Sequence, residues 1–271
     1  MTLRGTVALL AALPTALPAQ HQAPNPHVVL TLVSERTAVE PGRPLRLAIR
    51  LTVEAGWHVY WRNPGESGVA TVVRWTLPPG FSVEPLEWPV PEVFDIAGIR
   101  THVHHGDLAL GTTLRVPARP AASPLQIVAD VQYGVCKDAC YPGGARLILD
   151  LPWGTGRQDS RWAGLERLIE SRRPRSPSPF RLEARLRDTT VILTVHAPAG
   201  GALPEQLTFF PADQAVIRAA ITVRIPRGAG SVTMRLPLHA SPARPIQGVL
   251  AVGDPAARAP LGYEVLIRLA P

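Results

Sequence analysis

The sequence predicts an all-β protein: an immunoglobulin-like β-sandwich, a short helical linker and a second small β-sandwich domain. Short runs in which apolar and polar residues alternate are separated by turn residues, which is typical of half-buried strands. Helical spacing of apolar residues, in contrast, stands out between residues 160 and 172. A chain of 271 residues is long for one sandwich and comfortable for two small domains.

The first 19 residues have the pattern of a secretory signal peptide. Arg4 gives a short positive start, residues 5–17 are mostly apolar, and Ala19 is a suitable cleavage position. The apolar segment is too short to span a bilayer, and no later stretch approaches about 20 uninterrupted apolar residues. We therefore expect a soluble, exported protein in the periplasm, where disulfides persist.

Residues 27–152 are expected to form the immunoglobulin-like domain. In residues 45–53, apolar side chains alternate strictly with arginine, alanine and threonine, which gives one core face and one solvated face. Many short strands with turns at this spacing are typical of such sandwiches. The expected strands are residues 27–35, 45–53, 72–77, 81–83, 101–104, 108–116, 125–135 and 145–151.

An aromatic run at residues 56–61 interrupts this pattern. On a strand, His58 and Tyr60 point to one face and Trp57, Val59 and Trp61 to the other. One of these two sets must therefore face away from the core.

The pattern changes after residue 152. Residues 153–179 are expected to be a linker, in which a helix carries apolar residues at helical spacing and is followed by a proline-rich connector. The apolar positions are Trp162, Leu165, Leu168 and Ile169, and Asp159 or Ser160 is the candidate N-cap.

Residues 180–271 are expected to form the second β-sandwich, with a structural or partner-binding role. Its expected strands are residues 191–195, 207–210, 215–225, 231–238, 246–252 and 263–269. This segment holds no cysteine, and its two histidines are isolated in the sequence.

The formal charge of +7 does not indicate nucleic-acid binding. Lys137 is the only lysine among 28 basic residues, so the charge reflects a compositional preference for arginine. No aromatic and basic recognition motif accompanies it.

Cys136 and Cys140 are the only cysteines, and they follow a predicted strand. A tight turn through residues 137–139 can bring them within disulfide distance. Closing a loop of about five residues stabilises a fold by roughly 2 kcal/mol, against roughly 4 to 5 for about 100 residues, so a purely structural role gains little. A small ring at an exposed tip exchanges readily with thiols. Redox activity is favoured, and a structural disulfide or a metal site remains open.

The metal alternative is a periplasmic copper-binding or copper-delivery module. Two cysteines with three intervening residues form a soft site that suits Cu(I). His102 and His104, with the adjacent His105, could add imidazole ligands. The blander interpretation of these histidines is a polar turn.

Four segments together resemble the N-terminal periplasmic domain of the DsbD/ScsB thiol:disulfide interchange family: residues 56–68, 75–81, 94–98 and 135–142. The resemblance covers roughly residues 27–152 and implies an immunoglobulin-like fold. It also implies a cysteine pair that takes electrons from a thioredoxin-like domain. The pair would pass them to periplasmic disulfide isomerases or cytochrome c maturation thioredoxins. The expected two-domain layout is more similar to the ScsB branch.

The resemblance implies roles for particular residues. Cys136 and Cys140 match the exchanging pair, and Tyr60 with His58 matches the aromatic residues beside it. The other matches lie in the segment that caps the pair: Phe94, Asp95 and Ile96.

The expected function is thiol-disulfide exchange between thioredoxin-like partners, without a cofactor. The family's transmembrane region and C-terminal thioredoxin-like domain have no counterpart in this sequence. We therefore expect a separate membrane electron donor. An adaptor with an inert disulfide is the remaining alternative.

Overall fold

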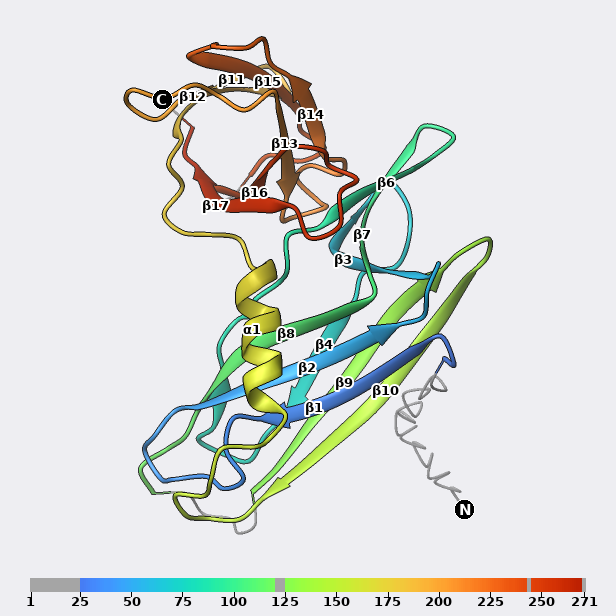
Figure 1. Ribbon diagram of the computed structural model, residues 1–271, viewed down its shortest axis with the longest axis vertical. Helices are drawn as coiled ribbons and strands as arrows, with labels where there is room; N and C mark the ends of the chain where they lie inside the picture. The colour runs from blue at the N-terminus through green and yellow to red at the C-terminus, as the bar shows by residue number, and fades with distance from the viewer. Residues whose placement is uncertain (1–24, 120–124, 243–244, 270–271) are drawn as a thin grey trace, which may run out of the picture.

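The computed structural model describes residues 25–119, 125–242 and 245–269. The predicted signal peptide, residues 1–19, lies outside them. Within the described residues, strands form two sandwiches and α1 (Trp162–Arg172) is the single α-helix, which confirms the all-β prediction (Figure 1).

The N-terminal sandwich consists of two antiparallel sheets. One has the strand order β1-β2-β8-β5, with β1 (Val28–Ser34), β2 (Leu45–Val53), β8 (Asp107–Arg115) and β5 (Ser82–Val83). The other has the order β10-β9-β3-β7-β6, with β10 (Cys140–Leu151), β9 (Leu125–Cys136), β3 (His58–Gly65), β7 (Ile99–His105) and β6 (Glu92–Ile96). A further strand, β4 (Val72–Thr76), pairs with β9.

The core of this sandwich follows the predicted alternation. The inward residues of β2, such as Leu47 and Ile49, are fully buried against Ile127 and Val131 of β9. Their neighbours Arg46 and Arg50 point outward and pair with Glu87 and Asp107. Burial of one face of each strand therefore fixes the register of both sheets.

Helix α1 covers the outer face of the β1-β2-β8 sheet (Figure 1). The contacting residues are Trp162, Leu165 and Ile169 of the helix and Val33, Ala48 and Ala109 of the sheet. The small alanines leave room for the helix to approach. Neither predicted N-cap residue occupies that position, since Arg161 does so without a side-chain hydrogen bond. The Asp159 carboxylate instead forms an ion pair with the Arg161 guanidinium, with 2.7 Å between Oδ2 and Nη2.

The C-terminal sandwich also has two antiparallel sheets. One has the order β11-β12-β15, with β11 (Arg181–Arg187), β12 (Thr190–His196) and β15 (Ser231–Pro237). The other has the order β14-β13-β16-β17, with β14 (Ile221–Arg224), β13 (Gln206–Pro211), β16 (Ile246–Val252) and β17 (Leu261–Ile267). Its own core includes Val191, Leu193, Phe209, Met234 and Leu250.

Strands β3 and β7 join the two sandwiches. Trp61 packs with Val90 of the N-terminal part and Phe210 and Val249 of the C-terminal part. The buried Asn63 amide donates hydrogen bonds to the carbonyl oxygens of Pro211 (2.8 Å) and Ile217 (3.2 Å). A buried amide with its donors satisfied makes this contact geometrically specific.

His102 of β7 completes the junction. Its Nε2 accepts a hydrogen bond from the backbone N–H of Ala220 at 2.9 Å, so its Nδ1–H donates to the carbonyl oxygen of Asn63 at 2.8 Å. This arrangement requires a neutral ring. Burial lowers the pKa of His102 to about 4, which keeps it neutral.

Strand β6 was missed by the sequence prediction. Residues 94–98, which the resemblance assigns to the cap, belong to the β6–β7 hairpin, whose turn has Ala97 at φ 53° and Gly98 at φ 86°. Positive φ at both central positions matches the right-handed twist of a hairpin. The segment is therefore held in place by backbone pairing.

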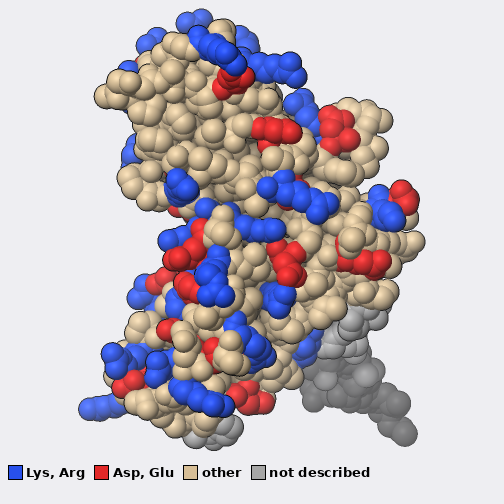
Figure 2. Space-filling model, in the orientation of Figure 1, with Lys and Arg blue, Asp and Glu red and all other residues tan. Residues whose placement is uncertain are grey.

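Charged side chains of both signs are interspersed over the face shown in Figure 2. Several form local pairs, such as Arg46 with Glu87 at 2.7 Å. In the part of the chain that the structure describes, no helix has the length and apolarity needed to cross a bilayer.

Candidate functional site

The two cysteines close the β9–β10 hairpin. A three-residue turn, residues 137–139, places Cys136 and Cys140 directly opposite each other, with Cα atoms 4.2 Å apart. Their sulfurs form a disulfide of 2.05 Å. The tight turn expected from the sequence therefore permits the bond.

The two sulfur-bearing residues differ in exposure. Cys140 is exposed, whereas Cys136 is only 2% exposed. Val135 points into the sandwich core, so Cys136 next to it lies on the opposite face of β9. The expectation that both lie at an exposed tip is wrong, because Tyr60, Val103 and Phe94 form a small second core over Cys136.

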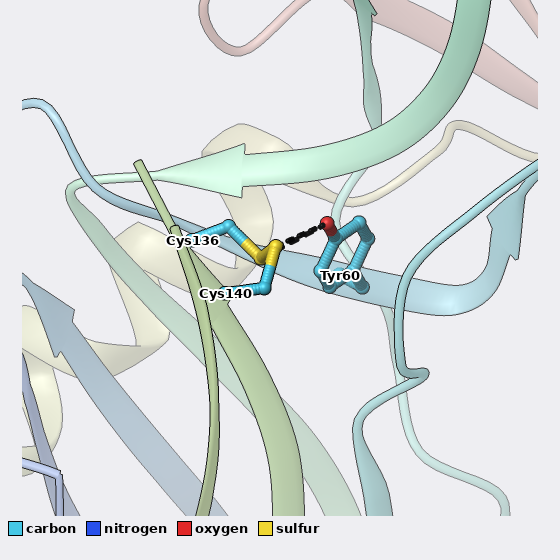
Figure 3. The surroundings of a disulfide bond; sticks show 3 residues. All are labelled: Tyr60, Cys136 and Cys140. Carbon is cyan, nitrogen blue, oxygen red and sulfur yellow. Dashed lines mark hydrogen bonds between the residues drawn. A yellow bond between two sulfur atoms is a disulfide. The ribbon is translucent and has the colours of Figure 1, made fainter. Parts of the chain in front are cut away.

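Tyr60 of β3 contacts both sulfurs (Figure 3). Its hydroxyl lies 3.1 Å from Cys136 Sγ and 3.6 Å from Cys140 Sγ. Disulfide sulfurs carry no hydrogen, so the tyrosine is the donor. Burial raises the pKa of Tyr60, which keeps that proton on the hydroxyl.

Two glycines shape the slot that holds the Tyr60 ring. A Cβ at Gly68, which has φ +101°, would lie 2.1 Å from Tyr60 Cε1. A Cβ at Gly134 would lie 3.3 Å from Tyr60 Cδ2 and 3.0 Å from Val69 Cβ. Sequence reasoning identified Tyr60 but missed these glycines, since their role depends on a ring that arrives from another strand.

His58 lies next to this pair, on the same face of β3. Its ring is 4.6 Å from Phe94, 5.4 Å from Tyr60 and 5.5 Å from His105, measured between ring centroids. His58 is 2% exposed. Burial, and then the neighbouring His105, lower the pKa of His58 to about 4, so it is neutral near pH 7.

Glu92 of β6 is a site residue that the sequence did not reveal. It is 4% exposed, and its Oε2 accepts a hydrogen bond from His105 Nδ1 at 2.6 Å. The sequence around Glu92 shows no regular alternation of apolar and polar residues, so nothing in it indicates that this glutamate is buried. The pairing becomes visible once β6 and β7 are aligned.

The predicted cap residues do not act alike. Phe94 packs on the cluster that covers Cys136. Asp95 is exposed and its Oδ1 accepts the backbone N–H of Gly98 at 2.9 Å, which supports the turn. Ile96 is 55% exposed. Only Phe94 of the three therefore covers the disulfide.

The alternative copper ligands are not brought together. Both ring nitrogens of His102 are engaged at the junction between the sandwiches. His104 is buried beneath Trp88, at 6.4 Å between ring centroids, and burial lowers its pKa to about 3. Among the described residues, no cluster of three histidine, cysteine or acidic side chains has metal-binding geometry.

The family comparison agrees with this site. Residues 30–152 match the model of the N-terminal domain of the thiol:disulfide interchange protein DsbD. This part of the chain is therefore a domain of the DsbD N-terminal type. The match includes Cys136, Cys140, Tyr60 and the β6–β7 hairpin. Among curated protein sequences, none matches the chain.

Solved structures extend the likeness in fold beyond the DsbD-type domain. The N-terminal periplasmic domain of ScsB from Proteus mirabilis is 16% identical, with a TM-score of 0.60. The alignment covers 91% of this chain and 95% of that one, so both sandwiches are included. The major pilin subunit BcpA of Bacillus cereus is 10% identical, with a TM-score of 0.30 over 88% of this chain and 66% of that chain, which is too distant to support an argument.

Proposed function

We propose that this protein is a periplasmic thiol-disulfide carrier that passes reducing equivalents between thioredoxin-like partners through Cys136 and Cys140. The observation that carries the proposal is the unequal burial of the two cysteines beside a hydrogen-bond donor. The match of residues 30–152 to the DsbD N-terminal domain supports it. The periplasmic location follows that of the ScsB domain, which shares the fold.

The exposure difference assigns the two sulfurs different tasks. A partner thiolate approaches the exposed Cys140 Sγ and forms a mixed disulfide, while the bond to Cys136 breaks and Cys136 leaves as a thiolate. The second thiolate of the same partner then attacks the partner sulfur in the mixed disulfide and displaces Cys140 as a thiolate. Two electrons have entered the pair, and the partner leaves oxidised.

In the opposite direction, Cys140 attacks the disulfide of an acceptor and Cys136 resolves the mixed disulfide. Tyr60 donates a hydrogen bond to Cys136 Sγ in the disulfide, and in the proposed mechanism it keeps this contact when Cys136 becomes a thiolate. Hydrogen bonds to charged groups are the stronger ones, so this contact favours the leaving thiolate. Neither a metal nor a cofactor is needed.

Single-cysteine variants test the assignment. The Cys136→Ser protein keeps the exposed sulfur. We expect its Cys140 thiolate to form a stable mixed disulfide with a thioredoxin-like oxidoreductase that lacks its own resolving cysteine and whose remaining cysteine is activated as a disulfide with thionitrobenzoate, which leaves as the thiolate. The matched Cys140→Ser protein keeps the buried sulfur and should trap much less. Equal trapping would contradict the assignment of Cys140 as the partner-facing sulfur. An absence of any mixed disulfide would leave an inert structural disulfide as the better interpretation.

A further inference from the structure

In the sheet, His58 has a cysteine opposite it on one side and a histidine opposite it on the other. In the register of the sheet, His58 lies opposite Cys136 of β9 on one side and opposite His105 of β7 on the other. Cβ atoms of such cross-strand neighbours are about 4.5 to 5.5 Å apart. The imidazole therefore stands between the buried sulfur and the Glu92–His105 pair.

The His58 ring packs among aromatic side chains. The residue is 2% exposed, and its ring lies near the rings of Tyr60, Phe94 and His105. A neutral imidazole has one nitrogen that can accept a proton.

Of the charged and titratable groups around the ring, the Glu92 carboxylate can support a transient positive charge, whereas His105 opposes one. His105 faces it from β7 and is bound to the buried Glu92 carboxylate of β6 at 2.6 Å. Tyr60 of β3 contributes only a hydroxyl, and the sulfurs of Cys136 and Cys140 come from β9 and β10. The only lysine, Lys137, extends past Gly56 in the turn before β3. Glu92 is thus the buried carboxylate that can balance an imidazolium here.

We propose that His58 accepts the proton of the Cys136 thiol when the reduced protein closes its disulfide. This deepens the proposed exchange function and rests on it. In the mixed disulfide, the Cys136 S–H proton moves to a ring nitrogen of His58 and the thiolate attacks Cys140 Sγ. The Cys136–Cys140 bond forms, the bond from Cys140 to the partner sulfur breaks, and the partner leaves as a thiolate. The protein has lost two electrons, the partner has gained them, and the imidazolium releases its proton to solvent.

The thiolate titration of Cys136 tests this without any partner protein. In the full chain carrying Cys140→Ser, Cys136 is the sole thiol, and its ionisation is followed by absorbance at 240 nm. We expect His58→Gln to reduce the thiolate fraction at pH 7 about tenfold, which corresponds to one pKa unit. His58→Phe, which keeps a packed ring without an acceptor, should give the same loss. His239→Gln, an exposed histidine in the C-terminal part, is the control and should leave the titration unchanged.

The second measurement is the pKa of His58 itself, by NMR of the ring carbons in the oxidised and the dithiol forms of the full chain. We expect it to titrate near pH 4 with the disulfide intact and at clearly higher pH after reduction, because a neighbouring thiolate favours the imidazolium. An identical pKa in both forms, or an unchanged Cys136 titration in both His58 variants, would overturn the proposal. Failure of the exchange function would instead appear as failure to trap a partner and would leave these titrations intact.

Discussion

At the scale of single residues, the site depends on one hydroxyl and two sulfurs of different exposure. Tyr60 is the residue whose contribution can be isolated, because its ring can be kept while its donor is removed. The oxygen lies 3.1 Å from Cys136 Sγ, and the ring fits a slot bounded by glycines. Phenylalanine at position 60 should therefore fold in the same way.

We predict that Tyr60→Phe slows reduction of the disulfide by a thioredoxin-like donor about tenfold to a hundredfold. A hydrogen bond to a charged group contributes about 1.5 to 3 kcal/mol, and here it would be lost from the leaving Cys136 thiolate. Stopped-flow fluorescence or quenched alkylation gives the rate. Tyr141→Phe, at an exposed tyrosine next to Cys140, is the control. Unchanged rates in Tyr60→Phe would remove the hydroxyl from the mechanism.

The sequence predicted those site residues whose placement depends only on neighbouring residues in the chain. The spacing of Cys136 and Cys140 and the parity of Tyr60 could be read directly, because turns and strand alternation are local properties. Glu92, Gly68 and the burial of Cys136 could not be read, since each depends on a strand that arrives from elsewhere.

At the scale of elements, the β6–β7 hairpin forms the cap over the site. Phe94 is its covering side chain, whereas Ile96 extends into solvent from the same strand. Pairing with β7 and the turn at Ala97 and Gly98 hold the hairpin in place. The strand was missed because residues 92–96 are short and lack a clear alternation, so only tertiary pairing defines it.

Phe94→Ala is predicted to expose the buried cysteine. Alkylation of Cys136 in the reduced protein, followed by mass spectrometry of the cysteine-containing peptide, should become several-fold faster. The reason is that the ring covering the Tyr60, Val103 and Cys136 cluster is removed. Ile96→Ala serves as the matched variant on the same strand and should behave like the unaltered protein. If both variants alkylate at the same rate, Phe94 is not the cap.

At the scale of the whole molecule, β3 and β7 serve two functions on their two faces. One face carries His58 and Tyr60 toward the disulfide, and the other carries Trp61 and His102 into the C-terminal sandwich. The cap strand is also tied there, since the backbone N–H of Val93 donates to the carbonyl oxygen of Pro255 at 2.7 Å. We interpret the C-terminal sandwich as a support for the strands that form the site.

The buried amide at this junction provides a stability test. Asn63→Ala removes the buried amide that donates to the carbonyl oxygens of Pro211 and Ile217. We expect the free energy of unfolding to fall by about 1 to 3 kcal/mol in denaturant titrations. Gln126→Ala, which removes an exposed amide paired with Asp150, should change it by less than about 0.5 kcal/mol. Equal effects would show that the junction is not a stabilising contact.

Acid should weaken the same junction. The pKa of His102 is lowered to about 4 in the folded protein from its ordinary value of 6.5. Its contribution to stability is therefore present above pH 6.5 and is lost as the pH falls toward 4, by at most about 1.4 kcal/mol per pH unit. His58 and His104 act in the same direction.

Unfolding by urea at pH 7.5 and pH 5 measures this dependence. The His102→Gln variant should lose less stability between the two pH values than the unaltered protein, by about the contribution of one histidine. His239→Gln, at an exposed position, should show the full loss. Parallel pH profiles for all three proteins would exclude His102 as a titrating group.

The reduction potential of the Cys136–Cys140 pair tests the central claim most directly. The full chain is equilibrated in thiol buffers of known potential, and the alkylated cysteines are counted by mass spectrometry. A carrier between thioredoxin-like partners should have a potential between about −180 and −270 mV, the range of exchange proteins. A potential below about −300 mV would mark a disulfide that resists exchange and would contradict the carrier function.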